Sequence, residues 1–260
     1  MKRFFYNMRK YHKYAIRSAK SELKSEVADS YLNWLWWIIE PFAFMLVYTF
    51  VFGFVFPNKT PYFASFIMVG LAMWDFFNRM VNGSVKLILN NRDLVTKVYI
   101  PKYILLYAKS LTYMFKMAIS LGLAFGLMIF QGVTLTWHIL LLIPVLIVLY
   151  VLAFGIGTIL MHFGVTFDDL ANLSNIGLRM LFYLSGVFYN IKEKLKGTVG
   201  FLMIRVNPVA FLMNEARKVC LYGKMISLEG MLFWFVIGLI ITAIGISIIH
   251  KYENSYAKVI

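Results

Sequence analysis

Cysteine and charge are both scarce in this chain of 260 residues. The single cysteine, Cys220, excludes an intramolecular disulfide and any metal site built from several cysteines. Only 15% of the residues are charged and 61% are hydrophobic, a balance that a soluble domain of this size would not tolerate on its surface. Residues 1–260 are therefore predicted to form one integral membrane domain.

Sequence motifs of common enzymes are missing as well. Gly223 and Lys224 are followed by Met225 and lack the upstream glycine of a phosphate-binding loop, and no HExxH motif occurs. The one adjacent carboxylate pair, Asp168 and Asp169, could hold a metal or a diphosphate, but it is better explained as the start of a helix. The sequence therefore predicts no catalytic residue, no metal site and no cofactor in this chain.

Acidic residues are few, because 12 Asp and Glu stand against 26 Lys and Arg, which gives a formal net charge of +14. In a soluble chain this excess would suggest nucleic acid. Here most basic residues lie between apolar runs, as they do in membrane-protein topology. Nucleic acid is therefore rejected as a partner, and membrane lipid is expected instead.

Six apolar runs predict an all-α membrane protein, since about 20 apolar residues cross a bilayer. They cover residues 34–56, 62–85, 104–130, 137–163, 170–190 and 231–249. Ahead of them, residues 1–31 include an amphipathic pattern typical of a helix in the headgroup layer on the cytoplasmic side, with a plain solvated tail as the alternative. Its apolar positions are Phe5, Met8, His12, Ile16, Ala19, Leu23, Val27 and Tyr31.

Charged residues inside the predicted spans need partners or water. Asp75 and Arg79 stand four apart with the acid first, which favours an intrahelical ion pair. Glu40, beside Pro41, should face protein or water. Lys116 and Arg179 likewise need charged partners or water. We interpret the Asp75–Arg79 pair as structural.

Lysine and arginine counts place both termini in the cytoplasm. With six spans, the predicted cytoplasmic segments hold 14 of these residues and the external segments 8, of which 7 fall within residues 191–225. Either the topology reverses after the fifth span, or these cations meet something anionic outside, such as lipid phosphates.

Aromatic residues run through the whole depth of the first span. Ordinary lipid-facing bulk explains them equally well. The sharper hypothesis is a translocation path on which sugar faces stack, lined chiefly by Trp37, Phe44 and Tyr48.

The order of several segments resembles the membrane subunit of ABC-type polysaccharide exporters, which include permeases for O-antigen, teichoic acid and rhamnose-rich glycans. The resemblance covers nearly the whole chain and rests on YLNWLWWIIEPFAFMLVYTFVFG, GLAMWDFF, NNRDLVTKVYIPK and NPVAFLMNEARKVCLYG. It implies a homodimer bound to two separate ATPase subunits that hold ATP and Mg²⁺. It also implies export of a polyprenyl-diphosphate-linked glycan across a bacterial plasma membrane. The family often has Arg-Asp before the fifth span, whereas this chain has Phe167-Asp168-Asp169, so any role of that arginine is not carried over.

Two loops are assigned roles within this hypothesis. Residues 90–101 are predicted to form a short capped helix that docks on the ATPase, the alternative being an ordinary basic loop, through Asn90, Asn91, Arg92, Asp93, Leu94, Val98 and Pro101. Residues 191–225 are predicted to form two short helices that re-enter from outside and close the path, the alternative being a surface hairpin. The gate residues are Arg205, Asn207, Pro208, Phe211 and Arg217.

Two other functions are consistent with the residues. A secondary transporter or channel would use Glu40, Asp75, Lys116 and Arg179 as ion-coupling groups, but no inverted repeat is detectable. A membrane transferase acting on polyprenyl phosphate would have to rely on Asp168 and Asp169.

Overall fold

The computed structural model describes residues 2–28, 31–55, 60–194, 198–253 and 255–256. Within these ranges all regular structure is helical, which confirms the predicted all-α class. Phe56 at the end of the predicted first span and Lys196 in the predicted gate lie outside the described residues.

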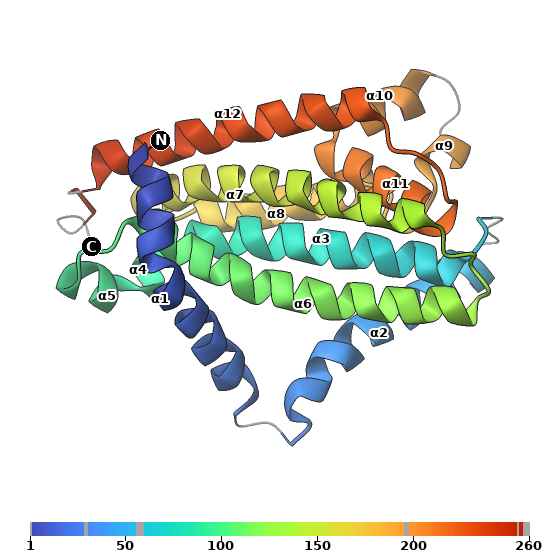
Figure 1. Cartoon of the computed structure of the whole chain (residues 1–260), viewed down its shortest axis with the longest axis horizontal. Coiled ribbons are helices and arrows are strands. Elements are labelled where there is room, and N and C mark those ends of the chain that lie inside the picture. The colour runs from blue at the N-terminus through green and yellow to red at the C-terminus, as the bar shows by residue number, and fades with distance from the viewer. Residues whose placement is uncertain (1, 29–30, 56–59, 195–197, 254, 257–260) are drawn as a thin grey trace.

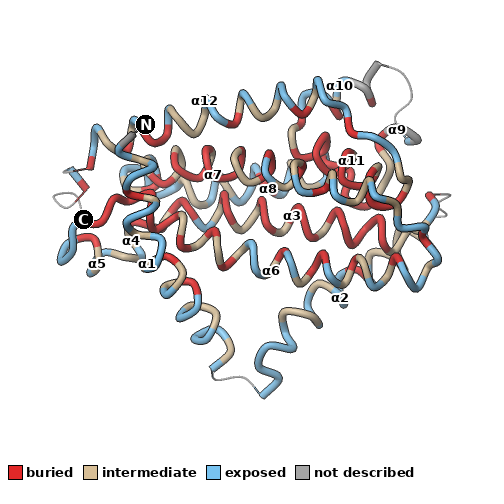
Figure 2. The backbone as a smooth tube through the Cα atoms, in the orientation of Figure 1, coloured by how far each residue is buried: buried red, intermediate tan, exposed pale blue. Residues whose placement is uncertain are grey.

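Four long helices form the body of the bundle and run side by side in Figure 1. They are α3 (Phe63–Val85), α6 (Lys102–Phe130), α7 (Leu142–Thr166) and α12 (Leu228–Tyr252). The central helix is α3, which packs against α2 (Trp36–Thr49), α6, α7, α8 (Leu170–Leu184) and α11 (Pro208–Leu221). Figure 2 accordingly shows α3 buried along most of its length.

Small residues allow α7 and α12 to pack closely. A Cβ atom added to Gly155 would lie 2.8 Å from the backbone nitrogen of Thr242, and one added to Gly245 would lie 2.1 Å from Thr158 Oγ1. Close backbone approach replaces the hydrophobic effect as the basis of helix association in lipid, so these glycines determine how tightly the two spans pack.

The short elements gather at opposite ends of the bundle (Figure 1). The two chain ends lie at the same end as α4 (Leu87–Asn90) and α5 (Arg92–Lys97). At the other end lie α9 (Ile191–Lys194), α10 (Thr198–Val206) and α11. The two loops assigned roles from the sequence are therefore a bundle length apart.

The first two helices depart from the bundle axis. Helix α1 (Lys2–Val27) crosses α6 at a steep angle, and α2 slopes away from the bundle toward the end of α1 (Figure 1). The predicted first span is not one continuous α-helix, because η1 (Asn33–Leu35, 3₁₀) precedes α2 and the π-helical η2 (Phe50–Val55) follows it. Pro41 lies inside α2 and lacks a backbone donor there.

Four described helical segments are long and apolar enough to cross a membrane. They are Asn33–Val55, Lys102–Phe130, Trp137–Thr166, which begins with η3 (Trp137–Leu141), and Leu228–Tyr252. The second and fifth predicted spans correspond to α3, which carries Asp75 and Arg79, and to α8, which has only 15 residues. The chain is thus a multi-pass membrane protein, and six spans remain a prediction.

Candidate functional site

A cavity of about 160 Å³ lies among α2, α3, α6 and α8. All three residues that the sequence predicted for a glycan path, Trp37, Phe44 and Tyr48, line it. The charged side chains of Glu40, Asp75, Arg79 and Lys116 line the same cavity, together with Pro41, Leu71, Trp74, Ser120 and Phe182. The structure therefore brings together two groups of residues that the sequence analysis had treated separately.

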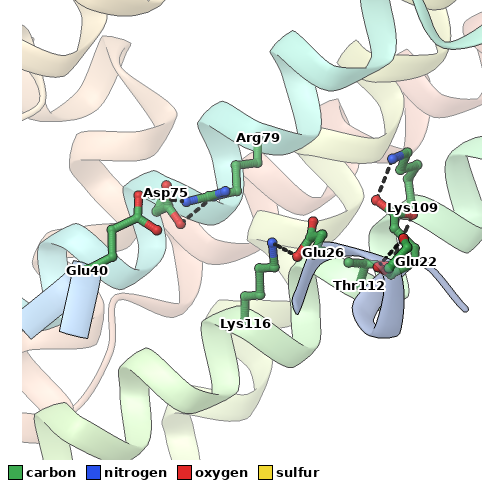
Figure 3. Close-up of polar contacts among 9 residues, drawn as sticks. Glu22, Glu26, Glu40, Asp75, Arg79, Lys109, Thr112 and Lys116 are labelled. Carbon is green, nitrogen blue, oxygen red and sulfur yellow. Dashed lines mark hydrogen bonds and ion pairs between the residues drawn. The ribbon is translucent and has the colours of Figure 1, made fainter. Parts of the chain in front are cut away.

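Arg79 joins the two carboxylates of the cavity (Figure 3). Its Nε donates to Asp75 Oδ2 at 2.7 Å, which confirms the predicted intrahelical pair. Its Nη2 lies 3.5 Å from Oε1 of Glu40, so the one charge of the predicted first span faces a cation of α3. Because isolated charges are costly inside a membrane, this arrangement stabilises the approach of α2 to α3.

Lys116 has a partner that the sequence analysis missed, since its Nζ lies 2.6 Å from Glu26 Oε2 of α1. One turn earlier on α1, Glu22 pairs with Lys109 and accepts from Thr112 Oγ1 at 3.5 Å (Figure 3). The spacing of these residues in the sequence was consistent with such contacts between α1 and α6. Glu22 and Glu26 stand four apart, and Lys109, Thr112 and Lys116 fall on one face of α6.

The packed face of α1 coincides only in part with the predicted apolar face, to which Ala19 belongs. Ala15 and Ala19 are buried, and Asn7 donates to Tyr103 Oη at 2.7 Å, whereas Phe5 is 63% exposed. His12, one of the positions on the predicted apolar face, is exposed, with Nδ1 2.8 Å from Tyr107 Oη. A polar seam therefore joins α1 to α6 along much of its length.

Aromatic contacts form the walls of the cavity. Trp37 packs edge-on against Phe115 of α6 with ring centroids 5.5 Å apart. Tyr48 stacks with Phe44 at 6.2 Å and contacts Phe188 at 4.5 Å. Phe44 is 51% exposed, so ring surface is available to a passing molecule.

The predicted ATPase-docking segment contains α5, but without the predicted caps. Asn91 occupies the N-cap position of α5, yet its side chain donates back to the carbonyl of Leu87 at 2.8 Å. Leu94 is half-buried, Val98 is extended and 47% exposed, and Pro101 is buried before α6. Asn90, Arg92 and Asp93 are exposed at the same end of the bundle.

The predicted gate segment is broken where the sequence indicated, since α10 ends at Val206 and α11 begins at Pro208. Asn207 caps α11, because its Oδ1 accepts from the amides of Val209 and Ala210 at 3.0 and 3.2 Å. Phe211 is buried and Arg205 is exposed.

The prediction that Arg217 faces lipid phosphates is wrong, because its side chain is buried inside the bundle. It is 5% exposed and donates to the backbone carbonyls of Phe66, Gly186 and Val187 at 3.1, 2.9 and 2.9 Å. Its guanidinium also lies 3.5 Å from the centroid of the Phe66 ring. Charge-assisted hydrogen bonds to carbonyls thus replace a carboxylate partner, and they fasten α11 to α3 and to the turn after α8.

The carboxylate pair before α8 takes no capping role. Asp169 occupies the N-cap position without a capping hydrogen bond from its side chain. Asp168 Oδ1 accepts from Lys86 Nζ at 2.8 Å, and this contact lowers the pKa of the exposed Asp168 carboxyl. A structural tie to the end of α3 therefore explains Asp168.

A bundle of apolar helices around a cavity lined by charged and aromatic side chains is typical of membrane transport proteins, in which ionisable residues inside the membrane mark pathways. The chain belongs to the ABC-2 type transporter family, which matches residues 17–221.

Curated relatives are similar in sequence to this chain along nearly its whole length. The O-antigen export system permease protein RfbA of Myxococcus xanthus is 27% identical over 94% of both chains. RfbA of Klebsiella pneumoniae is 24% identical over 92% of both, and the polysialic acid transport protein KpsM of Escherichia coli is 24% identical over 90% of this chain and 91% of its own.

Proposed function

We propose that this chain is the membrane subunit of an ATP-driven exporter that moves a polyprenyl-diphosphate-linked polysaccharide across a bacterial plasma membrane. Membership of the ABC-2 family and the names of its relatives favour this function over a secondary transporter or a polyprenyl phosphate transferase. ATP and Mg²⁺ belong to two partner ATPase subunits in this proposal.

One observation carries the proposal: Trp37, Phe44 and Tyr48 meet at one cavity on a span that the rest of the chain hardly covers. Of the most apolar 18-residue stretch within Asn33–Val55, only 6% is buried. On the neighbouring α8, Leu178 is the one buried residue. Two copies that meet along α2 and α8 would enclose the aromatic surface in a shared path. Weak stacking on ring faces would let a long chain slide.

The arrangement of the ends supports the proposed orientation. The two chain ends and α5 lie together, where a cytoplasmic ATPase could dock, and α9–α11 lie opposite, at the proposed external exit (Figure 1). Val98 is an exposed apolar residue of the docking segment. In this proposal, Arg205, Asn207, Pro208 and Phe211 belong to the gate, and Arg217 holds the gate helix in place.

Export in cells tests this function. A strain that lacks the chain is complemented with wild type, with a triple variant (Trp37→Ala, Phe44→Ala, Tyr48→Ala), or with a control (Phe130→Ala, Phe233→Ala) that removes exposed rings elsewhere. Surface glycan is measured against protein abundance in the membrane. We expect the control to export normally and the triple variant to export at least about tenfold less. The magnitude takes as its guide the about 1–3 kcal/mol that a nucleobase gains by stacking on one aromatic side chain. Normal export by the triple variant would contradict the proposed path.

A further inference from the structure

Carboxylates, not cations, are the accessible charges of the cavity. The side chains of Glu40 and Asp75 are 52% and 46% exposed, whereas those of Arg79 and Lys116 are 32% and 14% exposed. A molecule in the cavity therefore meets carboxylate oxygens more readily than it meets a cation.

The cations of the cavity are already engaged. Arg79 is held by two carboxylates at 2.7 and 3.5 Å, and Lys116 is held at 2.6 Å by Glu26, which reaches it from α1. Three carboxylates thus surround two cations, which leaves a formal charge of minus one. Arg79 could act as counter-ion to an anionic ligand only by leaving partners that themselves remain in the membrane.

Sugar hydroxyl groups are complementary to this surface. An ionised carboxylate only accepts hydrogen bonds, and a hydroxyl group can donate them. The carboxylate of a uronic or sialic acid, or a phosphodiester, would instead place like charges together where effective dielectric screening is weak. Such juxtaposition is a recognised means of rejecting the wrong partner.

We infer that the cavity selects for neutral repeat units and disfavours polyanionic glycans, through Glu40 and Asp75. This inference rests on the proposed glycan path and narrows its substrate class. The diphosphate of the carrier passes the cavity once for each exported glycan. A charged repeat unit, in contrast, would bring a new negative charge to Glu40 and Asp75 with every unit that passes.

The test uses two saccharide probes that differ only in the group at C6: a hexamer of galacturonic acid, and the same hexamer with its carboxyl groups reduced to alcohols. Purified full-length chain in lipid nanodiscs is titrated with each probe at matched ionic strength. Tryptophan fluorescence reports binding, because Trp37 and Trp74 line the cavity. Glu40→Gln with Asp75→Asn removes both charges at nearly constant shape. Glu40→Gln alone keeps the Asp75–Arg79 pair as a safeguard for folding, and Asp169→Asn is the control for a carboxylate away from the cavity.

We expect wild type and Asp169→Asn to bind the neutral hexamer at least about tenfold more tightly than the acidic one, because repulsion in the cavity is weakly screened. The double variant should reduce this ratio to within about twofold, and Glu40→Gln should reduce it in part. Equal binding of both probes by wild type, preference for the acidic hexamer, or an unchanged ratio in both variants overturns the inference and leaves the glycan path standing. Failure of both probes to bind overturns the path and the inference together.

Discussion

At the scale of single residues, Arg217 has the most specific environment in the described part of the chain. Two segments distant in sequence, α3 and the turn after α8, supply its three carbonyl partners. Gly70 leaves the room that Arg217 needs, since a Cβ there would lie 2.3 Å from Arg217 Nη2. The sequence signalled none of this, because a backbone carbonyl carries no residue-type pattern. What could be read locally was the helix start at Asn207-Pro208.

Arg217→Met should therefore destabilise the fold by about 3 kcal/mol or more, since it leaves buried carbonyl groups without donors. Arg217→Lys should recover only part of this loss, because a compact ammonium group cannot reach all three carbonyl oxygens as the planar guanidinium does. Thermal unfolding in detergent measures both. Arg205→Lys, at an exposed cation, is the control, and an unchanged melting temperature for Arg217→Met would contradict the assignment.

The Lys86–Asp168 contact predicts a small pH effect with a defined sign. Lys86 lowers the pKa of Asp168 in the folded state, so the stabilisation is present above the ordinary aspartate pKa of about 3.9 and is lost as pH falls through the lower folded pKa. The melting-temperature difference between wild type and Asp168→Asn should therefore vanish on acidification. A difference that persists below this window would exclude the ion pair as its cause.

At the scale of elements, the long spans were predictable and their ends were not. Apolar runs placed α3, α6, α7 and α12 within a few residues, since hydropathy alone defines a lipid-crossing segment. The fifth predicted span was extended to residue 190, but α8 ends at Leu184. The turn that follows contains Gly186 at φ 66° and is held by Arg217, a tertiary contact that no local pattern records.

The seam between α1 and α6 should contribute measurably to stability. Glu26→Gln and Lys116→Met should each cost about 1–3 kcal/mol, because either change leaves a poorly solvated charge, and the double variant should cost less than their sum. Asp93→Asn with Lys97→Met is the matched control, since that pair is 4.0 Å apart and highly exposed. Additive effects for Glu26 and Lys116 in this double-mutant cycle would mean that the pair contributes nothing.

The proposed docking role of α5 predicts a defect in ATPase binding that is separable from a defect in folding. Val98→Asp should abolish co-purification of the ATPase and leave the permease folded, because Val98 is exposed at the end where docking is proposed. Leu94→Asp should do the same but with some loss of stability, since Leu94 packs against the core. Val206→Asp, at an exposed valine of the opposite end, serves as the control. Retention of the ATPase by Val98→Asp would move the docking site elsewhere.

At the scale of the whole molecule, the arrangement of the two ends gives the membrane orientation a direct test. In a Cys220→Ala background, cysteines at Lys194 and Lys224, both exposed, should react with an impermeant thiol reagent on intact protoplasts. A cysteine at Lys97 should react only after lysis. Protection of the first two until lysis would place α9–α11 in the cytoplasm and reverse the topology after the fifth span.

The central claim is that this chain is half of a permease driven by separate ATPase subunits, and native mass spectrometry of the tagged chain extracted from its own membrane tests it most directly. The account predicts a complex of two copies of this chain with two copies of one ATPase. It also predicts that Val98→Asp releases the ATPase and preserves the pair of permease chains. A single chain with no nucleotide-hydrolysing partner, from membranes in which the glycan is being exported, would contradict it.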